Sequence, residues 1–126
     1  MRIKRFEEIE AWKASRMLNQ ALMSAHRKMQ CTRDGFWLRQ IRKCPISAMA
    51  NIAEGFDAGT NREFVRFLRI AYRSVTEFQS HLYAGLDGRY FDQQTFDQLY
   101  LQAHETKGRI GGFTRYLKQH LDRPPR

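Results

Sequence analysis

The sequence predicts an all-α protein that folds as an antiparallel, up-down-up-down four-helix bundle. Apolar residues recur at helical spacing in four long segments, whereas the alternation typical of strands is weak. The connections between the segments are short and contain glycine or polar residues, which favours antiparallel neighbours. A length of 126 residues is typical of one domain, so we expect a single domain over 1–126 with helices at about 7–29, 36–58, 61–87 and 93–121.

The first two predicted helices each carry an apolar face. In 7–29 the face is made of small and aliphatic residues: Ala11, Ala14, Leu18, Ala21, Leu22, Ala25 and Met29. In 36–58 it consists of Trp37, Ile41, Cys44, Ala48 and Ile52. Pro45 removes a backbone donor, so a kink is expected between Ile41 and Pro45. Further apolar residues outside these faces favour self-association, with Ile9 and Trp12 folding back over the bundle end as the alternative.

The last two predicted helices have clear start signals. Gly59 ends the second helix, and Thr60 with Glu63 is typical of a capping box for 61–87. The apolar face of that helix is nearly heptad in spacing: Phe64, Phe67, Leu68, Ala71, Val75, Phe78 and Leu82. Asp92 can cap 93–121, whose inner face is Phe96, Leu99, Ala103, Ile110, Leu117 and Leu121.

A signature joins the second and third predicted helices. It consists of Gln40-Ile41-Arg42, Ser47, the run ANIAEGF at 50–56, Glu63-Phe64, the run RFLRIA at 66–71, Ser74 and Glu77. This pattern resembles the four-helix-bundle family of ribosomal-RNA intervening-sequence proteins, which is related to the accessory variability proteins of diversity-generating retroelements. The resemblance implies a homopentameric ring. It also implies an accessory role, as a scaffold for a reverse transcriptase and its template RNA or cDNA.

The chain is strongly basic, with a net charge of +9 and an isoelectric point near 10.1. Positive charge is in excess in every quarter of the sequence, so it belongs to the folded body. Such a body attracts polyanions, and we predict RNA or DNA as the partner. The alternative is that the charge only maintains solubility.

No long apolar run occurs, so we expect neither a signal peptide nor a membrane span. We therefore expect a cytoplasmic location. The two cysteines, Cys31 and Cys44, are expected to be free thiols.

Four arginines share one face of the third predicted helix. Spacings of four, three and four residues place them opposite the apolar face, and we call them the arginine ridge: Arg62, Arg66, Arg69 and Arg73. A guanidinium group pairs bidentately with phosphate, so the ridge is the predicted nucleic-acid-binding site. The supplementary candidates are Arg39, Arg42 and Lys43 of the second helix and Arg115 and Lys118 of the fourth. The alternative is internal pairing with Glu63 and Glu77, although two carboxylates cannot neutralise four arginines.

A row of polar residues runs along the facing edges of the second and third helices. We call it the polar seam: Ser47, Asn51, Glu54, Ser74 and Glu77. Hydroxyl, amide and carboxylate groups there can satisfy one another and fix helix register or an oligomer contact. A metal site at Glu54, Glu63 and Glu77 is the alternative, but di-metal bundles use Glu-x-x-His pairs on two helices. Glu77 and His81 are four residues apart and no second pair exists, so no metal and no cofactor is predicted.

A ribonuclease alternative rests on Arg115 and His120, because some helical-bundle ribonucleases use an arginine followed four to six residues later by a histidine. A chain this rich in arginine contains such a pair by chance. No phosphate-binding glycine loop, paired-cysteine zinc motif or nucleophile elbow occurs. We therefore predict a non-catalytic, oligomeric nucleic-acid-binding accessory protein. The alternative from another class is a structural ring that docks an acidic protein.

Overall fold

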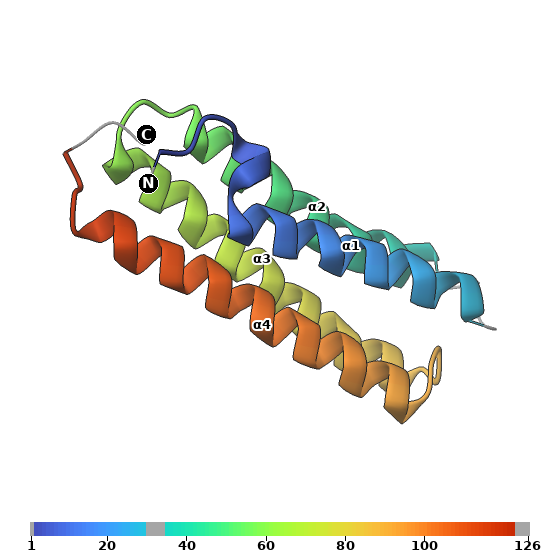
Figure 1. Ribbon diagram of the computed structural model, residues 1–126. Coiled ribbons are helices and arrows are strands. Elements are labelled where there is room, and N and C mark those ends of the chain that lie inside the picture. Colours follow the sequence, from blue (N-terminus) through green and yellow to red (C-terminus); the bar gives the residue numbers. More distant parts are fainter. Residues whose placement is uncertain (1, 30–34, 123–126) are drawn as a thin grey trace.

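Four long helices make up the protein in a computed structural model that describes residues 2–29 and 35–122 (Figure 1). They are α1 (Glu10–Lys28), α2 (Gly35–Phe56), α3 (Asn61–Asp87) and α4 (Gln93–Lys118), and a short 3-10 turn, η1 (Phe6–Glu8), precedes them. No strand occurs in the described ranges. The predicted all-α fold is confirmed.

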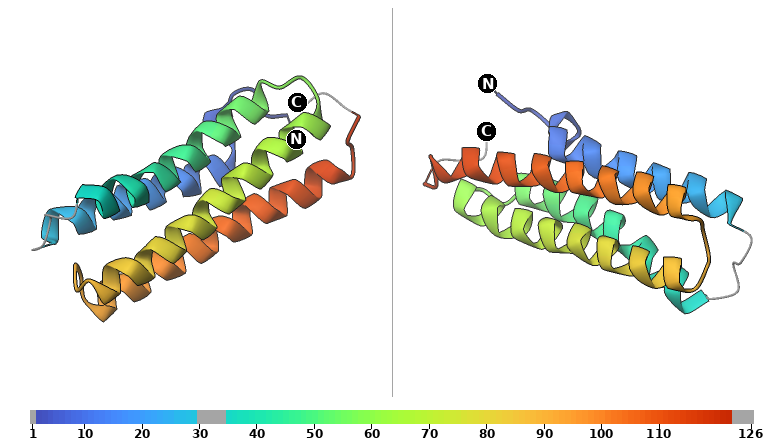
Figure 2. Two further views of the ribbon diagram at one scale, coloured as in Figure 1. Left: turned by 180° about the vertical axis from the view of Figure 1, so that it is seen from behind. Right: turned by 90° about the horizontal axis from the view of Figure 1, so that it is seen from below.

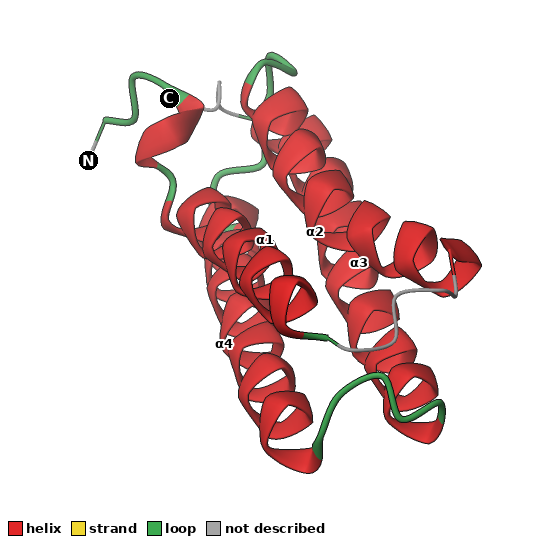
Figure 3. Ribbon diagram, turned by 90° about the vertical axis from the view of Figure 1, so that its right-hand side faces the viewer, coloured by secondary structure: helices red, strands yellow, loops and turns green. Residues whose placement is uncertain are grey.

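Consecutive helices run in opposite directions, as the up-down-up-down topology requires (Figure 1). α1 packs on α2 and α4, and α3 packs on the same two helices, so α1 and α3 lie diagonally across the bundle. The α2–α3 pair forms the most extensive interface, and α3–α4 is next. Figures 2 and 3 show the same arrangement from behind, from below and from one end. The outer face of α3 is therefore remote from α1.

The first helix begins later than the predicted residue 7. Ile9 has an extended backbone, with φ −74° and ψ 123°, and separates η1 from α1. Its side chain is 2% exposed, and Phe6 packs edge-on against Trp12 with ring centroids 5.1 Å apart. Burial of this apolar group outweighs continued helix, because about 1.5–3 kcal/mol is gained for each fully buried side chain. Within one chain, Ile9 is therefore buried and Trp12 is partly buried against the core, as the folded-back arrangement expects.

The predicted caps of α3 and α4 are present. Gly59 has a positive φ of 94°, which favours glycine, and the Thr60 hydroxyl accepts a hydrogen bond from the Glu63 backbone N–H at 3.2 Å. The Asp92 carboxylate accepts from the Thr95 N–H at 2.8 Å, and this bond lowers the pKa of Asp92.

Two helices end earlier than the sequence predicts. α2 ends at Phe56 instead of residue 58, because the next two N–H groups bond to carbonyls three residues back. α4 likewise ends at Lys118 instead of 121, where Gln119 and His120 make such bonds. A hydrogen bond to the carbonyl three residues back, instead of four, tightens the last turn and ends the α-helix.

The core is centred on α3. Its apolar face is buried except for Phe67, which is half-buried, and every member of the predicted α2 face is buried. Gly55 lets α2 and α3 approach each other closely, because a Cβ there would lie 2.6 Å from the Phe64 ring.

α2 continues through Pro45, so the expected kink does not interrupt the helix. None of the helices in the described part of the chain is both long and apolar enough to cross a membrane.

Candidate nucleic-acid interface

The arginine ridge lies on the exposed side of α3, and all four side chains are exposed. Arg66 is 3.6 Å from the Glu63 carboxylate, and Arg62 is 3.1 Å from Asp122. The expected pair between Arg73 and Glu77 is not formed, since Glu77 lies 3.5 Å from the His81 ring nitrogen instead. Within residues 2–29 and 35–122, Arg69 and Arg73 have no ion pair. Two carboxylates therefore lie beside four arginines, so the ridge keeps a net positive charge.

A cleft of about 390 Å³ opens where the ridge meets the end of α4. We call it the arginine cleft, and its lining residues are Arg62, Val65, Arg66, Arg69, Lys118 and Leu121. Four of the six are cations, and two are apolar. The Arg62 N–H donates to the Leu121 carbonyl at 3.0 Å, and the Asn61 amide donates to the His120 carbonyl at 2.7 Å. These bonds hold the start of α3 against the end of α4 and so fix the walls of the cleft.

The supplementary candidates on α2 lie elsewhere. Arg39 and Lys43 are exposed, but neither lines the arginine cleft. The Trp37 indole N–H donates to the His81 carbonyl at 2.8 Å, which sets this part of α2 beside the C-terminal half of α3. Arg73 lies beyond the cleft, about 16 Å along the helix from Arg62 at 1.5 Å per residue.

Three members of the polar seam form one hydrogen-bonded chain between α2 and α3. The Ser47 and Ser74 hydroxyl oxygens are 2.9 Å apart, and Ser74 donates to the Ile70 carbonyl at 3.0 Å. Because Ser74 gives its proton to that carbonyl, Ser47 donates to Ser74. The Asn51 amide then donates to the Ser47 carbonyl at 2.8 Å. Glu54 is exposed and makes none of these bonds.

Comparison with known proteins assigns a family. The model of the 23S rRNA-intervening sequence protein family matches residues 7–112, which include the whole arginine ridge. The chain belongs to this family.

One solved structure similar to this family member is a protein of unknown function from the S23 ribosomal protein family of Bacteroides thetaiotaomicron VPI-5482. It is 17% identical over 83% of this chain and 98% of its own, with a TM-score of 0.73. At that identity the likeness supports the fold alone. No curated protein matches the chain significantly.

Glu77, the fifth seam residue, lies beside Cys44 and His81. One donor atom from each of the three residues falls within 4.8 Å of the others. Burial, and secondarily the Glu77 carboxylate, raises the pKa of the Cys44 thiol from 9.0 to about 12. Cys44 is a free thiol and donates to the Gln40 carbonyl at 3.4 Å. Sequence spacing could not reveal this group, because Cys44 comes from a different helix.

The raised pKa of Cys44 predicts a loss of stability at alkaline pH. Between pH 9 and 12 the unfolded chain releases the thiol proton while the folded chain retains it, so the free energy of unfolding falls as pH rises. Below pH 9 this thiol contributes no pH dependence. Urea unfolding at several pH values from 8 to 11, with a chelator present, would measure the slope.

The control for this experiment is Cys44→Ala, in a Cys31→Ser background so that Cys44 is the one thiol of the parent. Contributions from tyrosine and lysine are the same in both proteins and cancel in the difference. Parallel pH profiles for parent and Cys44→Ala would contradict the predicted retention of the proton.

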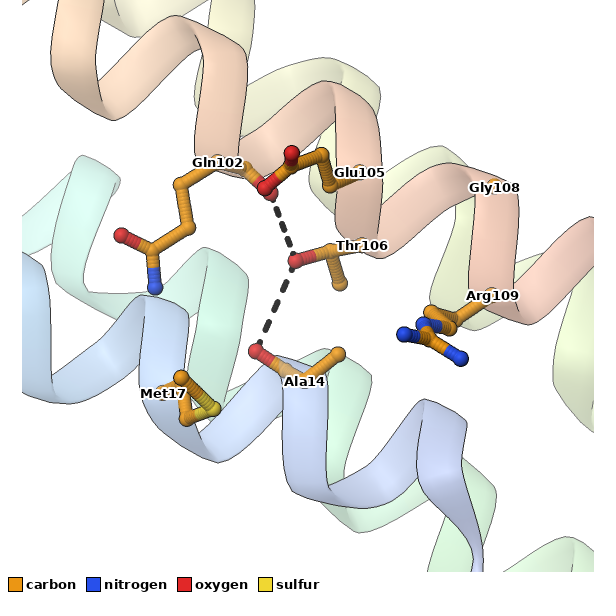
Figure 4. Close-up of a pocket in the computed structure, with 7 residues that line it drawn as sticks. All are labelled: Ala14, Met17, Gln102, Glu105, Thr106, Gly108 and Arg109. Atoms are coloured by element: carbon orange, nitrogen blue, oxygen red, sulfur yellow. Dashed lines mark hydrogen bonds between the residues drawn. The ribbon is translucent and has the colours of Figure 1, made fainter.

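The α1–α4 side of this family member carries a cleft of another character. It measures about 460 Å³ and contains one acidic and one basic side chain, Glu105 and Arg109 (Figure 4). The Thr106 hydroxyl donates to the Gln102 carbonyl at 2.8 Å and lies 3.5 Å from the Ala14 carbonyl. The charges balance, so this cleft does not match a polyanion.

In the described chain no hydrogen bond joins the side chains of Arg115 and His120, the pair of the ribonuclease alternative.

Proposed function

We propose that this 23S rRNA-intervening sequence protein is a non-catalytic protein that binds RNA or DNA through the phosphates. The arginine cleft carries the proposal, because four cations line it and, within the described residues, only two carboxylates pair with them, Asp122 with Arg62 and Glu63 with Arg66. Arginine forks pair bidentately with phosphate, and α3 presents them on an exposed, firmly packed helix.

The mode of binding follows from the shape of the ridge. The ridge offers cations in a line along a helix surface, and phosphate contacts of this kind position a nucleic acid without reading its sequence. We therefore propose binding without strong sequence preference. Arg73 would extend the contact beyond the cleft, because it has no ion pair within the described residues.

The proposal includes a homopentameric ring that acts in the cytoplasm as a scaffold for a reverse transcriptase and its template. A ring would repeat the ridge and add the fields of its copies. Large apolar side chains outside the core supply surface for self-association, among them Phe36, Ile46 and Leu101. Native mass spectrometry counts the subunits directly, and a monomeric mass would contradict the ring.

A genomic locus with neither a reverse transcriptase nor a ribosomal-RNA insertion would contradict the scaffold role.

The first test is a titration with a labelled RNA of arbitrary sequence at about 50 and 200 mM salt. If six to ten phosphates of a single strand are contacted, the affinity is expected to fall by roughly 300- to 16,000-fold between the two, because bound counterions are released on binding. Fluorescence anisotropy gives both dissociation constants.

Absence of binding at the lower salt would contradict the proposal. The structural ring that docks an acidic protein would then take first place. Cleavage of the RNA that is lost in His120→Ala would instead establish the ribonuclease alternative.

A further inference from the structure

Cys44, Glu77 and His81 bring three different metal-binding atoms together at the α2–α3 interface. Cys44 belongs to α2, and the other two are one turn apart on the same face of α3. Thiol sulfur, carboxylate oxygen and imidazole nitrogen all lie within 4.8 Å of one another. In the part of the chain that the structure describes, no other three such residues lie this close together.

The histidine nitrogen has no satisfactory partner in the protein. His81 Nε2 is buried and has no hydrogen bond, although its ring as a whole is 26% exposed. Glu77 Oε2 lies 3.5 Å away, within ion-pair distance, but the geometry is not that of a hydrogen bond. Buried polar atoms are nearly always satisfied, so an unpaired nitrogen beside a thiol and a carboxylate points to a missing ligand.

We propose that Cys44, Glu77 and His81 bind a divalent transition-metal ion, with Zn²⁺ as the preferred ion and water as the fourth ligand. Sulfur, nitrogen and oxygen donors together suit a borderline-soft ion, whereas Mg²⁺ and Ca²⁺ take oxygen ligands. One thiolate and one carboxylate neutralise the charge of the ion.

The distances require a small contraction. A tetrahedral zinc ion with bonds of about 2.0–2.3 Å holds its ligand atoms about 3.3–3.8 Å apart. The present spread of up to 4.8 Å closes by a side-chain movement of about 1 Å. Glu77 can make this movement, because its side chain is 60% exposed. The same exposure gives the ion a path from solvent.

The bonding change is simple. The S–H bond of Cys44 is replaced by an S–Zn bond, and the proton passes to the buffer. His81 binds through the Nε2 lone pair of its neutral imidazole form, and Glu77 binds through a carboxylate oxygen. The result is a cross-link between α2 and α3 beside the polar seam, which is expected to raise the melting temperature in proportion to the logarithm of zinc concentration above the dissociation constant.

Cobalt titration tests the proposal, with Cys31→Ser as the parent so that Cys44 is its one thiol. One equivalent of Co²⁺ should produce a thiolate-to-cobalt charge-transfer band, and Zn²⁺ should abolish it. Cys44→Ser should lose the band. Glu77→Gln and His81→Gln should weaken Zn²⁺ binding by about 100-fold or more, measured by competition with a chromophoric chelator.

His104→Gln is the matched control, since His104 is an exposed histidine on α4. It should keep the affinity of the parent. Circular dichroism without metal monitors folding, and Glu77→Gln keeps the test decisive because Glu77 is exposed. No charge-transfer band in the parent, or equal Zn²⁺ affinity in Glu77→Gln and His104→Gln, would overturn the assignment.

Discussion

Replacing Arg66 and Arg69 with glutamate is expected to abolish binding to RNA at about 50 mM salt. Both side chains line the arginine cleft and both are exposed, so the change reverses two contacts without disturbing the core. Below about 50 mM salt, where residual binding is measurable, the slope of log affinity against log salt should lose about 1.4 if each arginine contacts one phosphate of a single strand. Anisotropy titrations over a salt series would measure both quantities.

A matched control separates local contact from net charge. Lys13→Glu with Arg27→Glu makes the same change in net charge on α1, which lies diagonally opposite α3. Both of these residues are exposed, so the fold is kept. An equal loss of affinity in the two double variants would contradict the arginine ridge as the binding site and attribute the binding to overall charge.

Leu68→Ala is expected to lower the free energy of unfolding by about 2–5 kcal/mol, because the substitution leaves a cavity in the core. Leu68 is 0% exposed and lies on the face of α3 that packs against α2 and α4. Urea unfolding followed by circular dichroism would measure the loss.

Ile70 provides the comparison on the same helix. It is 40% exposed, so Ile70→Ala removes less buried surface and should cost less than about 1 kcal/mol. Similar losses for both variants would show that the register assigned to α3 is wrong. The pair also tests whether the ridge faces solvent, since register fixes both faces at once.

The sequence was sufficient for the helices wherever apolar spacing and local caps agreed. The α3 face and the caps at Thr60 and Asp92 follow from short-range chemistry, which a single segment contains. The burial of two hydroxyl side chains does not follow from apolar spacing. Ser15 and Thr106 are core residues because each bonds the carbonyl four residues back, at 2.9 and 2.8 Å, and so hides its polarity within the helix.

The candidate site was only partly accessible in the same way. Helical spacing placed the arginine ridge on one exposed face, since all four residues share a helix. The sequence offers Lys118 as a supplementary candidate but does not place it or Asp122 beside Arg62, because their approach depends on where α4 ends and how it docks on α3. Cys44 and His81 meet for a similar reason. How far one helix is shifted along its neighbour is decided by tertiary packing. The spacing of apolar residues within a single helix does not determine this shift.

The two ends of the described chain lie at the same end of the bundle, where α3 begins (Figure 1). Asp122, the last residue that the structure describes, contacts Arg62 there, so a negatively charged group attached next to Asp122 would compete with a polyanion for the arginine cleft. The connection between α3 and α4 lies at the far end (Figure 1). Immobilisation through Gln94→Cys, at an exposed position in the first turn of α4, would leave the cleft facing the solution.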